Sequence, residues 1–371
     1  MSFEKWPKFT FWRAVLLVIL SAGFYSTLLR FTKGLGAATH LSDRFPWGLW
    51  IGFDVICGVG LAAGGFTLAA IVYVFNLRRF RPILRPSILT AFLGYALVAL
   101  ALLFDLGRPY NIWHPLIMWN PHSVMFEVAW CVMLYLTVLA LEFSPAVFER
   151  FKMQGPLKLL KAITIPLVIV GVLLSTLHQS SLGSLFLIVP SKLHPYWYSP
   201  LLPGFFFISA VGVGMATVIF ESNLSARAFG KEIEMPLLSA LGKAMGAVLG
   251  VYGILRFLDL WRRGALVHLR EPSMETLLFG LEITLGVLIP FLLLLPRPVR
   301  EDRQGLFAAA VLVITGFLLN RLNVSITGLE YSAHAHYFPK WTEVSVTLSM
   351  VGTLFLCFAL AVRYLHVFEA D

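Results

Sequence analysis

Long apolar runs separated by short polar segments dominate this chain. A helix needs about 20 apolar residues to cross the hydrocarbon of a bilayer. Ten runs reach or approach that length, and the ninth, with 17 residues, is the shortest. Because hydrocarbon cannot solvate backbone amides, each run is predicted to be a helix. The predicted spans are residues 11–29, 49–75, 87–104, 124–143, 159–177, 201–220, 235–260, 274–295, 306–322 and 344–365.

The composition supports an all-α integral membrane protein. The 371 residues are 58% hydrophobic and 13% charged, with a mean hydropathy of +0.81, whereas soluble domains are about 25% charged. The first run follows a short basic start, as in a secretory signal peptide. It exceeds the usual apolar region of about 7–15 residues and lacks a convincing small-residue cleavage site. We therefore predict that it is retained as a helix.

Lysine and arginine predict the orientation, because they concentrate in cytoplasmic loops. With a cytoplasmic N-terminus, the inner loops are the more basic, as in RRFRPILRP between spans two and three. Ten spans then place both termini in the cytoplasm. The net charge of +9 is explained by anchoring to an anionic leaflet. The scattered basic residues argue against nucleic-acid binding. The four longest connections, residues 30–48, 105–123, 178–200 and 323–343, all fall on the outer side.

Two parts of the chain repeat each other at an offset of 154 residues. The segment GVGLA from Gly58 recurs as GVGMA from Gly212, and an Asp/Arg pair recurs at the same offset. Spans two to five therefore pair with spans six to nine as a parallel repeat. The predicted organisation is one membrane domain over residues 1–371. It comprises a first four-helix bundle (47–185), a second four-helix bundle (200–330), and a last helix with a cytoplasmic tail (341–371).

Three ionisable residues inside or at the end of spans are the strongest candidates for chemistry. Charges in a bilayer are costly and usually face a bundle interior. Asp54 lies seven residues beyond Trp47, about 10 Å in from the outer end, and Glu127 lies about 9 Å in. His178 closes the outer end of span five. Asp54, Glu127 and His178 are the predicted proton donors, and the alternative is that each simply bridges neighbouring helices.

The residues predicted to line the same outer site are Trp50, Asp105 and Arg108, together with Asp54 and His178 from the proton-donor candidates. The second copy keeps an Asp/Arg pair and a glutamate but lacks the equivalents of Asp54 and His178. A proton path or structural ion pairs, such as Glu282 with Arg256 or Lys243, would explain its charges. Structural pairing is the favoured interpretation.

The histidines and cysteines argue against a metal centre or heme in this chain. A membrane cytochrome of the b type needs pairs of axial histidines facing each other within spans. Here His178 and His366 lie at predicted span ends, and the other seven histidines fall in outer loops. The HAH pair, His334 and His336, is best explained as a polar loop. Three scattered cysteines (Cys57, Cys131, Cys357) show no metal-binding spacing, and no dinucleotide or P-loop fingerprint occurs in a plausible setting.

Several segments resemble the NrfD/polysulfide-reductase-type membrane subunits, and among them the HybB-type subunit of quinone-linked nickel–iron hydrogenases. They are FPWGLWIGFD (45–54), VYVFN (72–76), RPSIL (85–89), ALEFSPAVFER (140–150), HQSSLGSL (178–185) and YFPKWTE (337–343). The resemblance covers essentially the whole chain. Asp54, Glu127 and His178 lie inside or beside these motifs. The match at DLGRP (105–109) is weaker and leaves the identity of the partner open.

The resemblance implies an integral subunit without its own redox cofactor and with a menaquinone or ubiquinone pocket on the periplasmic side. A periplasmic ferredoxin-like iron–sulfur subunit would pass electrons to it from a catalytic subunit. We therefore expect a membrane anchor of a respiratory oxidoreductase in the bacterial inner membrane, most plausibly an uptake hydrogenase, and not an enzyme by itself. The alternatives are an NrfD-type complex with a molybdenum or multiheme partner, a proton or solute transporter, and a passive scaffold.

Overall fold

The computed structural model describes residues 10–230, 232–333 and 335–368. Within these ranges ten helical segments are long and apolar enough to cross a membrane, which confirms the predicted number of spans. The fifth and ninth are longer than the apolar runs suggested. The segments are α1 (Phe11–Lys33), η1–η2 (Trp50–Val74), η3–α5 (Arg78–Asp105), α6 (Val124–Arg150), α7–η6 (Gln154–Ile188), α8 (Leu202–Phe229), α9 (Met235–Arg262), α10–α11 (Met274–Leu294), α13–α14 (Arg303–Ala333) and α15 (Trp341–Tyr364).

Several spans are interrupted by π-helical turns. The second span begins with the π-helix η1 (Trp50–Cys57), continues through α3 (Gly58–Leu61) and α4 (Gly64–Ala69), and ends in the π-helix η2 (Ala70–Val74). Others are η9 (Thr284–Leu288) and η10 (Asn323–Thr327). Such turns insert an extra residue into a helix and occur often at functional sites. Two predicted site residues, Trp50 and Asp54, lie in η1, so the π-helical geometry determines which way their side chains point.

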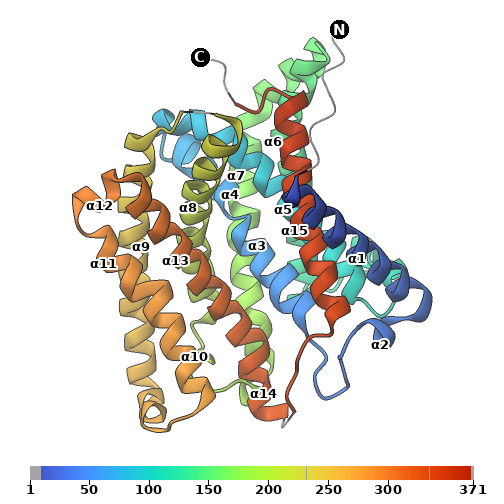
Figure 1. Cartoon of the computed structure of the whole chain (residues 1–371), viewed down its shortest axis with the longest axis vertical. Coiled ribbons are helices and arrows are strands. Elements are labelled where there is room, and N and C mark those ends of the chain that lie inside the picture. Colours follow the sequence, from blue (N-terminus) through green and yellow to red (C-terminus); the bar gives the residue numbers. More distant parts are fainter. Residues whose placement is uncertain (1–9, 231, 334, 369–371) are drawn as a thin grey trace.

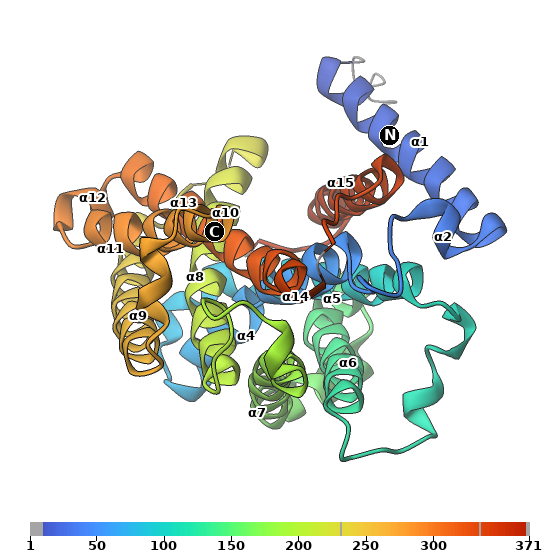
Figure 2. The same ribbon diagram turned by 90° about the horizontal axis from the view of Figure 1, so that it is seen from below.

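The helices form two groups joined along α8 and flanked by the first and last helices. Seen from one end of the molecule, α4–α7 lie on one side and α8–α11 with α13 on the other (Figure 2). The helices α1 and α15 pack against each other, and α15 also packs on α5 and η1. The last turn of α15 lies at one end of the molecule, and α1 is tilted, with its first turn nearer to that end than its last turn (Figure 1).

Glycines allow the closest helix contacts. A Cβ atom added at Gly316 on α13 would overlap the backbone of Gly286 on η9, and one at Gly214 on α8 would lie 2.9 Å from the carbonyl oxygen of Ala63. Only glycine permits backbones to approach this closely, and small residues are enriched at helix contacts in membranes. The glycine-rich middle of the second span therefore joins the two helix groups.

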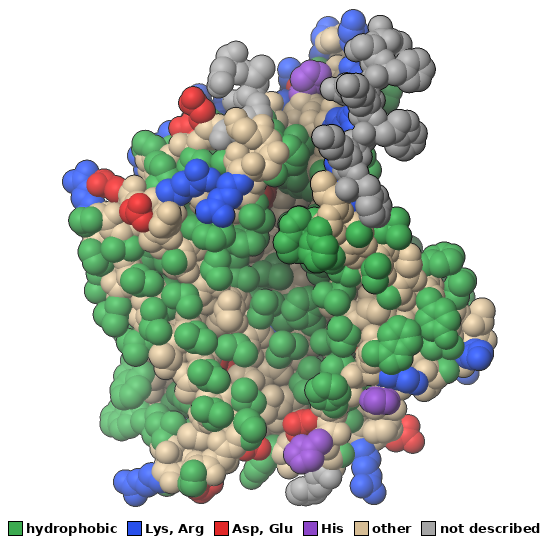
Figure 3. Space-filling view, in the orientation of Figure 1, with side chains coloured by type: hydrophobic (Ala, Val, Ile, Leu, Met, Phe, Trp, Pro, Cys, Tyr) green, Lys and Arg blue, Asp and Glu red, His purple; other side chains and the backbone are tan. Residues whose placement is uncertain are grey.

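The surface separates into an apolar belt and two polar ends. Hydrophobic side chains cover the middle of the face in Figure 3, while charged and histidine side chains gather at the two ends. The same face is hollowed between α13 and α15, where Figure 1 shows α3 and the neighbouring end of η1 behind them. Hydrophobic side chains surround this recess (Figure 3).

Candidate functional site

Asp54 and Trp50 both turn toward the last helix. Asp54 is 8% exposed, and its Oδ2 accepts a hydrogen bond of 2.7 Å from the Thr347 hydroxyl of α15. The Trp50 indole Nε1 donates to the backbone carbonyl oxygen of Glu343 at 3.2 Å. Trp50 also packs with Val346. The first turns of η1 are thus held by polar and apolar contacts to α15.

Glu343 is a buried acceptor at the outer end of α15. One of its carboxylate oxygens accepts from the backbone N–H groups of His40 and Lys340 at 3.0 and 2.8 Å. The other accepts from the Tyr337 hydroxyl. That hydroxyl in turn accepts from the backbone N–H of Leu49. Burial and the hydrogen bond to Glu343 raise the pKa of Tyr337, so the phenol stays protonated and keeps donating.

Asp105 lies near this cluster but does not pair with Arg108. The chain leaves the helix at Leu106, which is extended, so the spacing of three residues no longer places Arg108 on the face of Asp105. Arg108 is exposed. The charge facing Asp105 belongs instead to Arg30 of α1. Arg30 donates to the carbonyl oxygens of Phe104 and Leu106 at 2.6 Å each and so caps the end of α5.

One oxygen of Asp105 remains without a partner. Its Oδ1 is buried and accepts no hydrogen bond within the described part of the chain. Buried carboxylate oxygens are normally bonded to protein or to ordered water. Asp54 and Trp50 of η1 and Asp105 of α5, three residues of the predicted outer site, thus lie on helices that pack against each other. The recess between α13 and α15 borders α15, the helix that carries Thr347 (Figures 1 and 3).

His178 lies in a different place, inside the first helix group. It is fully buried within α7, six residues before the end of that helix, and does not close the span as expected. Its Nδ1 is 2.7 Å from the carbonyl oxygen of Leu174, so Nδ1 carries the hydrogen and donates. Its Nε2 then accepts from the Tyr95 hydroxyl at 2.5 Å. The Tyr135 ring packs against the imidazole, with centroids 5.5 Å apart.

The candidates therefore separate instead of converging on one level. Trp50, Asp54 and Asp105 lie toward α15, whereas His178 has its contacts with Tyr95 and Tyr135 on α5 and α6. Glu127 is half-buried in the first turn of α6, next to the cap residue Ser123. Sequence reasoning placed these residues by depth alone. It could not give the rotation of each helix, which decides what a side chain faces.

Four residues that contact the predicted site residues were not themselves predicted: Tyr95, Tyr135, Glu343 and Thr347. Tyr95 and Tyr135 are polar groups in the middle of apolar spans, which is a usable signal. Glu343 belongs to the segment YFPKWTE that carries part of the family resemblance. Thr347 follows it by one helical turn, on the same face, and gave no signal of its own.

The second helix group holds a separate buried polar network. The prediction that Glu282 pairs with Arg256 or Lys243 is wrong. In the part of the chain that the structure describes, Glu282 forms no ion pair with either residue. The Glu282 carboxylate accepts from three neutral donors instead, namely Trp197 Nε1, Asn320 Nδ2 and Asn323 Nδ2, at 2.8, 2.7 and 2.9 Å. Arg256 donates to the carbonyl oxygen of Tyr196, and Lys243 is exposed.

The repeated Asp/Arg pair also differs from the expectation in this second group. Asp259 forms an ion pair of 2.8 Å with Arg263, one helical turn away, and not with Arg262. A spacing of four residues brings two side chains to the same helix face. The offset of 154 residues thus aligns residue types without aligning their contacts.

The histidines do not fit a heme held between helices. Among the described residues, His178 is the only histidine inside a span, and both of its ring nitrogens are engaged. No cluster of three or more histidine, cysteine or acidic side chains suited to a metal ion occurs in residues 10–230, 232–333 and 335–368. Of the HAH pair, His334 lies outside the described residues, and His336 is fully exposed.

Comparisons with known proteins match nearly the whole chain. A family model described as "Polysulphide reductase, NrfD" matches residues 37–332. A protein of Nitratidesulfovibrio vulgaris is 41% identical, over 94% of this chain and 93% of that protein. The Escherichia coli "Probable Ni/Fe-hydrogenase 2 b-type cytochrome subunit" is 35% identical, over 91% and 87%. The "Menaquinone reductase, integral membrane subunit" of N. vulgaris is 29% identical, over 98% and 93%.

Proposed function

Because the chain belongs to the polysulphide reductase NrfD family, we propose that it is the quinone-interacting membrane subunit of a respiratory oxidoreductase. The quinone headgroup enters from the lipid through the recess between α13 and α15 and docks beside Asp54 and Trp50. The observation that carries this proposal is the position of Asp54. It is a buried carboxylate with one neutral partner, Thr347, and Thr347 belongs to α15, which borders the recess.

The chemistry requires two electrons and two protons for each quinone reduced to a quinol. The electrons come from an iron–sulfur cluster of a partner subunit, and this chain supplies binding and protons. Protonated Asp54 donates a hydrogen bond to a quinone carbonyl and then its proton. The outer polar cluster with Asp105 returns a proton from water. His178, hydrogen-bonded to Tyr95, is the second candidate for proton supply, from within the first bundle.

The partner is proposed from the relatives. One is named as a nickel–iron hydrogenase subunit and another as a menaquinone reductase subunit. We infer a periplasmic ferredoxin-like iron–sulfur subunit and, behind it, a hydrogenase catalytic subunit. The quinone is menaquinone or ubiquinone. The less favoured alternative is another oxidoreductase of this family, with a molybdenum or multiheme catalytic partner.

The orientation follows from the basic residues. Arg78, Arg79 and Arg81 begin the third span, and Arg85 of the same span donates to the carbonyl oxygen of His366, two residues beyond the end of α15. We infer that this end faces the cytoplasm of a bacterium and that the outer site faces the periplasm. We infer also that this chain binds no heme, although one relative is named a b-type cytochrome subunit, because His178 has no free nitrogen and no facing histidine.

The substitution Asp54→Asn tests the proposal in the intact complex. It keeps the hydrogen bond with Thr347 possible but removes the titrating group, so electron transfer to quinone should fall at least about 100-fold, the usual contribution of a general acid. Dye-linked activity of the catalytic partner should not change. Glu127→Gln, at a half-buried carboxylate away from the recess, is the matched control and should retain quinone reduction.

Two results would contradict the proposal. Unchanged quinone reduction in Asp54→Asn would remove the carboxylate from the reaction. Solute uptake by the isolated subunit without any partner would favour a transporter. The depth of Asp54 argues against transport, because transporter sites lie near the bilayer midplane, whereas Asp54 lies only four residues, about 6 Å, into its span.

A further inference from the structure

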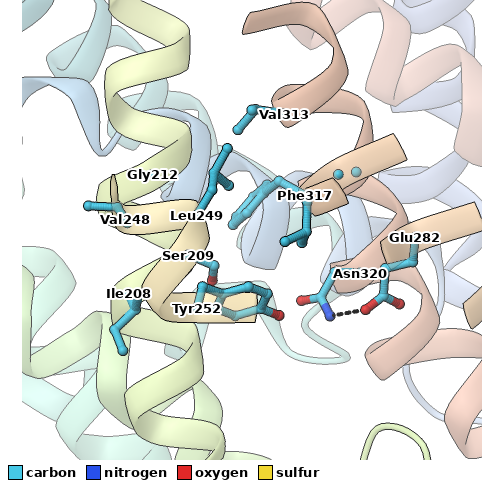
Figure 4. Close-up of a pocket in the computed structure, with 13 residues that line it drawn as sticks. Ile208, Ser209, Gly212, Val248, Leu249, Tyr252, Glu282, Val313, Phe317 and Asn320 are labelled. Atoms are coloured by element: carbon cyan, nitrogen blue, oxygen red, sulfur yellow. Dashed lines mark hydrogen bonds between the residues drawn. The ribbon is translucent and has the colours of Figure 1, made fainter. Parts of the chain in front are cut away.

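A cavity lies within the second helix group, apart from the proposed quinone site. Its volume is about 30 Å³, and its walls come from α8, α9, α13 and the α10–η9 segment. Most of the wall is apolar, as at Val313 and Phe317. One end is polar, where side chains of Ser209, Tyr252, Glu282 and Asn320 face the space (Figure 4).

A chain of hydrogen bonds fixes this polar end. Arg321 donates from Nη1 to Asn320 Oδ1 at 2.7 Å and from Nη2 to the Ser209 hydroxyl at 2.8 Å. Asn320 then donates from Nδ2 to Glu282 Oε1 at 2.7 Å. Because a guanidinium only donates, the orientation of the Asn320 amide is determined. The side chains around the cavity are therefore held in place and are not free to collapse into it.

Glu282 has one acceptor position left, on the oxygen next to the cavity. A carboxylate offers about four acceptor positions, two on each oxygen. Oε2 accepts from Trp197 and Asn323, so both of its positions are used. Oε1 accepts only from Asn320. Glu282 is 2% exposed, so bulk water does not fill the remaining position.

Tyr252 supplies the opposite side of the gap. Its ring is 6% exposed, and its hydroxyl points toward Asn320 and Glu282 without a hydrogen bond to any residue drawn (Figure 4). A phenol buried in a bundle normally has a partner. A water molecule needs about 10–15 Å³ and two to four polar partners. The cavity meets both conditions and has room for one or two waters.

We propose that this cavity is a permanent water-binding site of the second bundle. The bound water accepts from the Tyr252 hydroxyl, donates to Glu282 Oε1, and can donate to the Ser209 hydroxyl oxygen. It connects α9 with the Arg321–Asn320–Glu282 chain that joins α10 and α13. The site does not depend on the quinone site, since no residue is shared between them.

Filling the cavity with a methyl group should lower the thermal stability of the protein if the cavity holds water and raise it if the cavity is dry. A Cβ added at Gly212, in the cavity wall, would meet only Val248 Cγ1, at 3.6 Å, which is an ordinary contact. If the cavity is dry, this methyl group fills a void and stabilises the protein. If it holds water, the methyl group displaces that water and leaves Glu282 and Tyr252 short of partners.

The control is Gly280→Ala on α10, where an added Cβ has no neighbour within 4 Å. Both changes raise helix propensity equally. We expect a midpoint of thermal unfolding for Gly212→Ala about 2 °C or more below that of Gly280→Ala, measured on the full chain. An equal or higher midpoint for Gly212→Ala would overturn the proposal.

Xenon provides an independent test on the unchanged protein, since dry apolar cavities bind xenon and hydrated ones do not. We expect no xenon at this site under pressure. We also expect density for water within hydrogen-bond distance of Tyr252 Oη and Glu282 Oε1 in an experimental map. Xenon binding here, or density for a lipid chain in the cavity, would contradict a water site.

Discussion

At the scale of single residues, the hydrogen-bond partners of a buried carboxylate define its role. Asp54 has one neutral donor, which leaves it free to exchange a proton with a ligand. Glu343 has three donors and Glu282 has three, so both serve to hold helices in place. A buried carboxylate can thus exchange a proton in one position and hold helices together in another.

The Tyr95 hydroxyl should matter for stability. Tyr95→Phe removes the donor to His178 Nε2 and leaves a buried acceptor unsatisfied, which costs about 1–3 kcal/mol. Thermal unfolding in detergent should detect this loss. Tyr110→Phe, at a ring that is 71% exposed, is the control and should have no effect. Equal midpoints for the two variants would show that the hydrogen bond between Tyr95 and His178 is not made.

His194, in the outer loop between α7 and α8, should make stability depend on pH. Burial lowers the pKa of His194, and the nearby His268 acts in the same direction against Glu275 and Glu271. The unfolded chain binds the proton more readily, near the ordinary pKa of about 6.5. The contribution of neutral His194 is therefore complete above that pH and is lost as the pH falls below it.

This dependence can be measured by comparing His194 with asparagine. Asparagine can accept from the Tyr196 N–H as Nδ1 of His194 does, but it does not titrate. The unfolding midpoint of the wild type should fall more steeply between about pH 7 and 5 than that of His194→Asn. Parallel curves for the two proteins would exclude His194 as the titrating group.

At the scale of helices, glycines and π-turns decide how the spans meet. The apolar runs predicted the ten helices. The π-turns were not predicted, because apolar periodicity does not reveal one extra residue in a turn. They rotate side chains relative to a regular helix, so the sequence could not give the neighbours of Asp54.

The contact between η9 and α13 should tolerate no side chain. In Gly316→Ala the new Cβ would overlap the backbone of Gly286, so the two helices must separate, at a cost of about 1–3 kcal/mol. The control is Gly204→Ala on α8, where an added Cβ meets nothing within 4 Å. Thermal unfolding should show a lower midpoint for Gly316→Ala only, and similar midpoints would mean that the helices are farther apart.

At the scale of the whole molecule, composition and span count predicted a polytopic bundle correctly, and the family resemblance is confirmed. The division into two bundles related by an offset of 154 residues stays a prediction, and the equivalent Asp/Arg pairs have different contacts. The sequence could not place α15 beside η1, since their contacts join residues about 290 positions apart, as in the bond between Asp54 and Thr347. This long-range contact creates the proposed quinone site.

The most direct test of the central claim is to map where a quinone binds. A photoreactive menaquinone analogue, activated by light in membranes that contain the intact complex, can be located by mass spectrometry. Our account predicts that the label falls on residues 50–57 or 341–350 and that excess menaquinone prevents it. Label confined to α9 and α10, or label that menaquinone does not compete away, would contradict a quinone site beside Asp54.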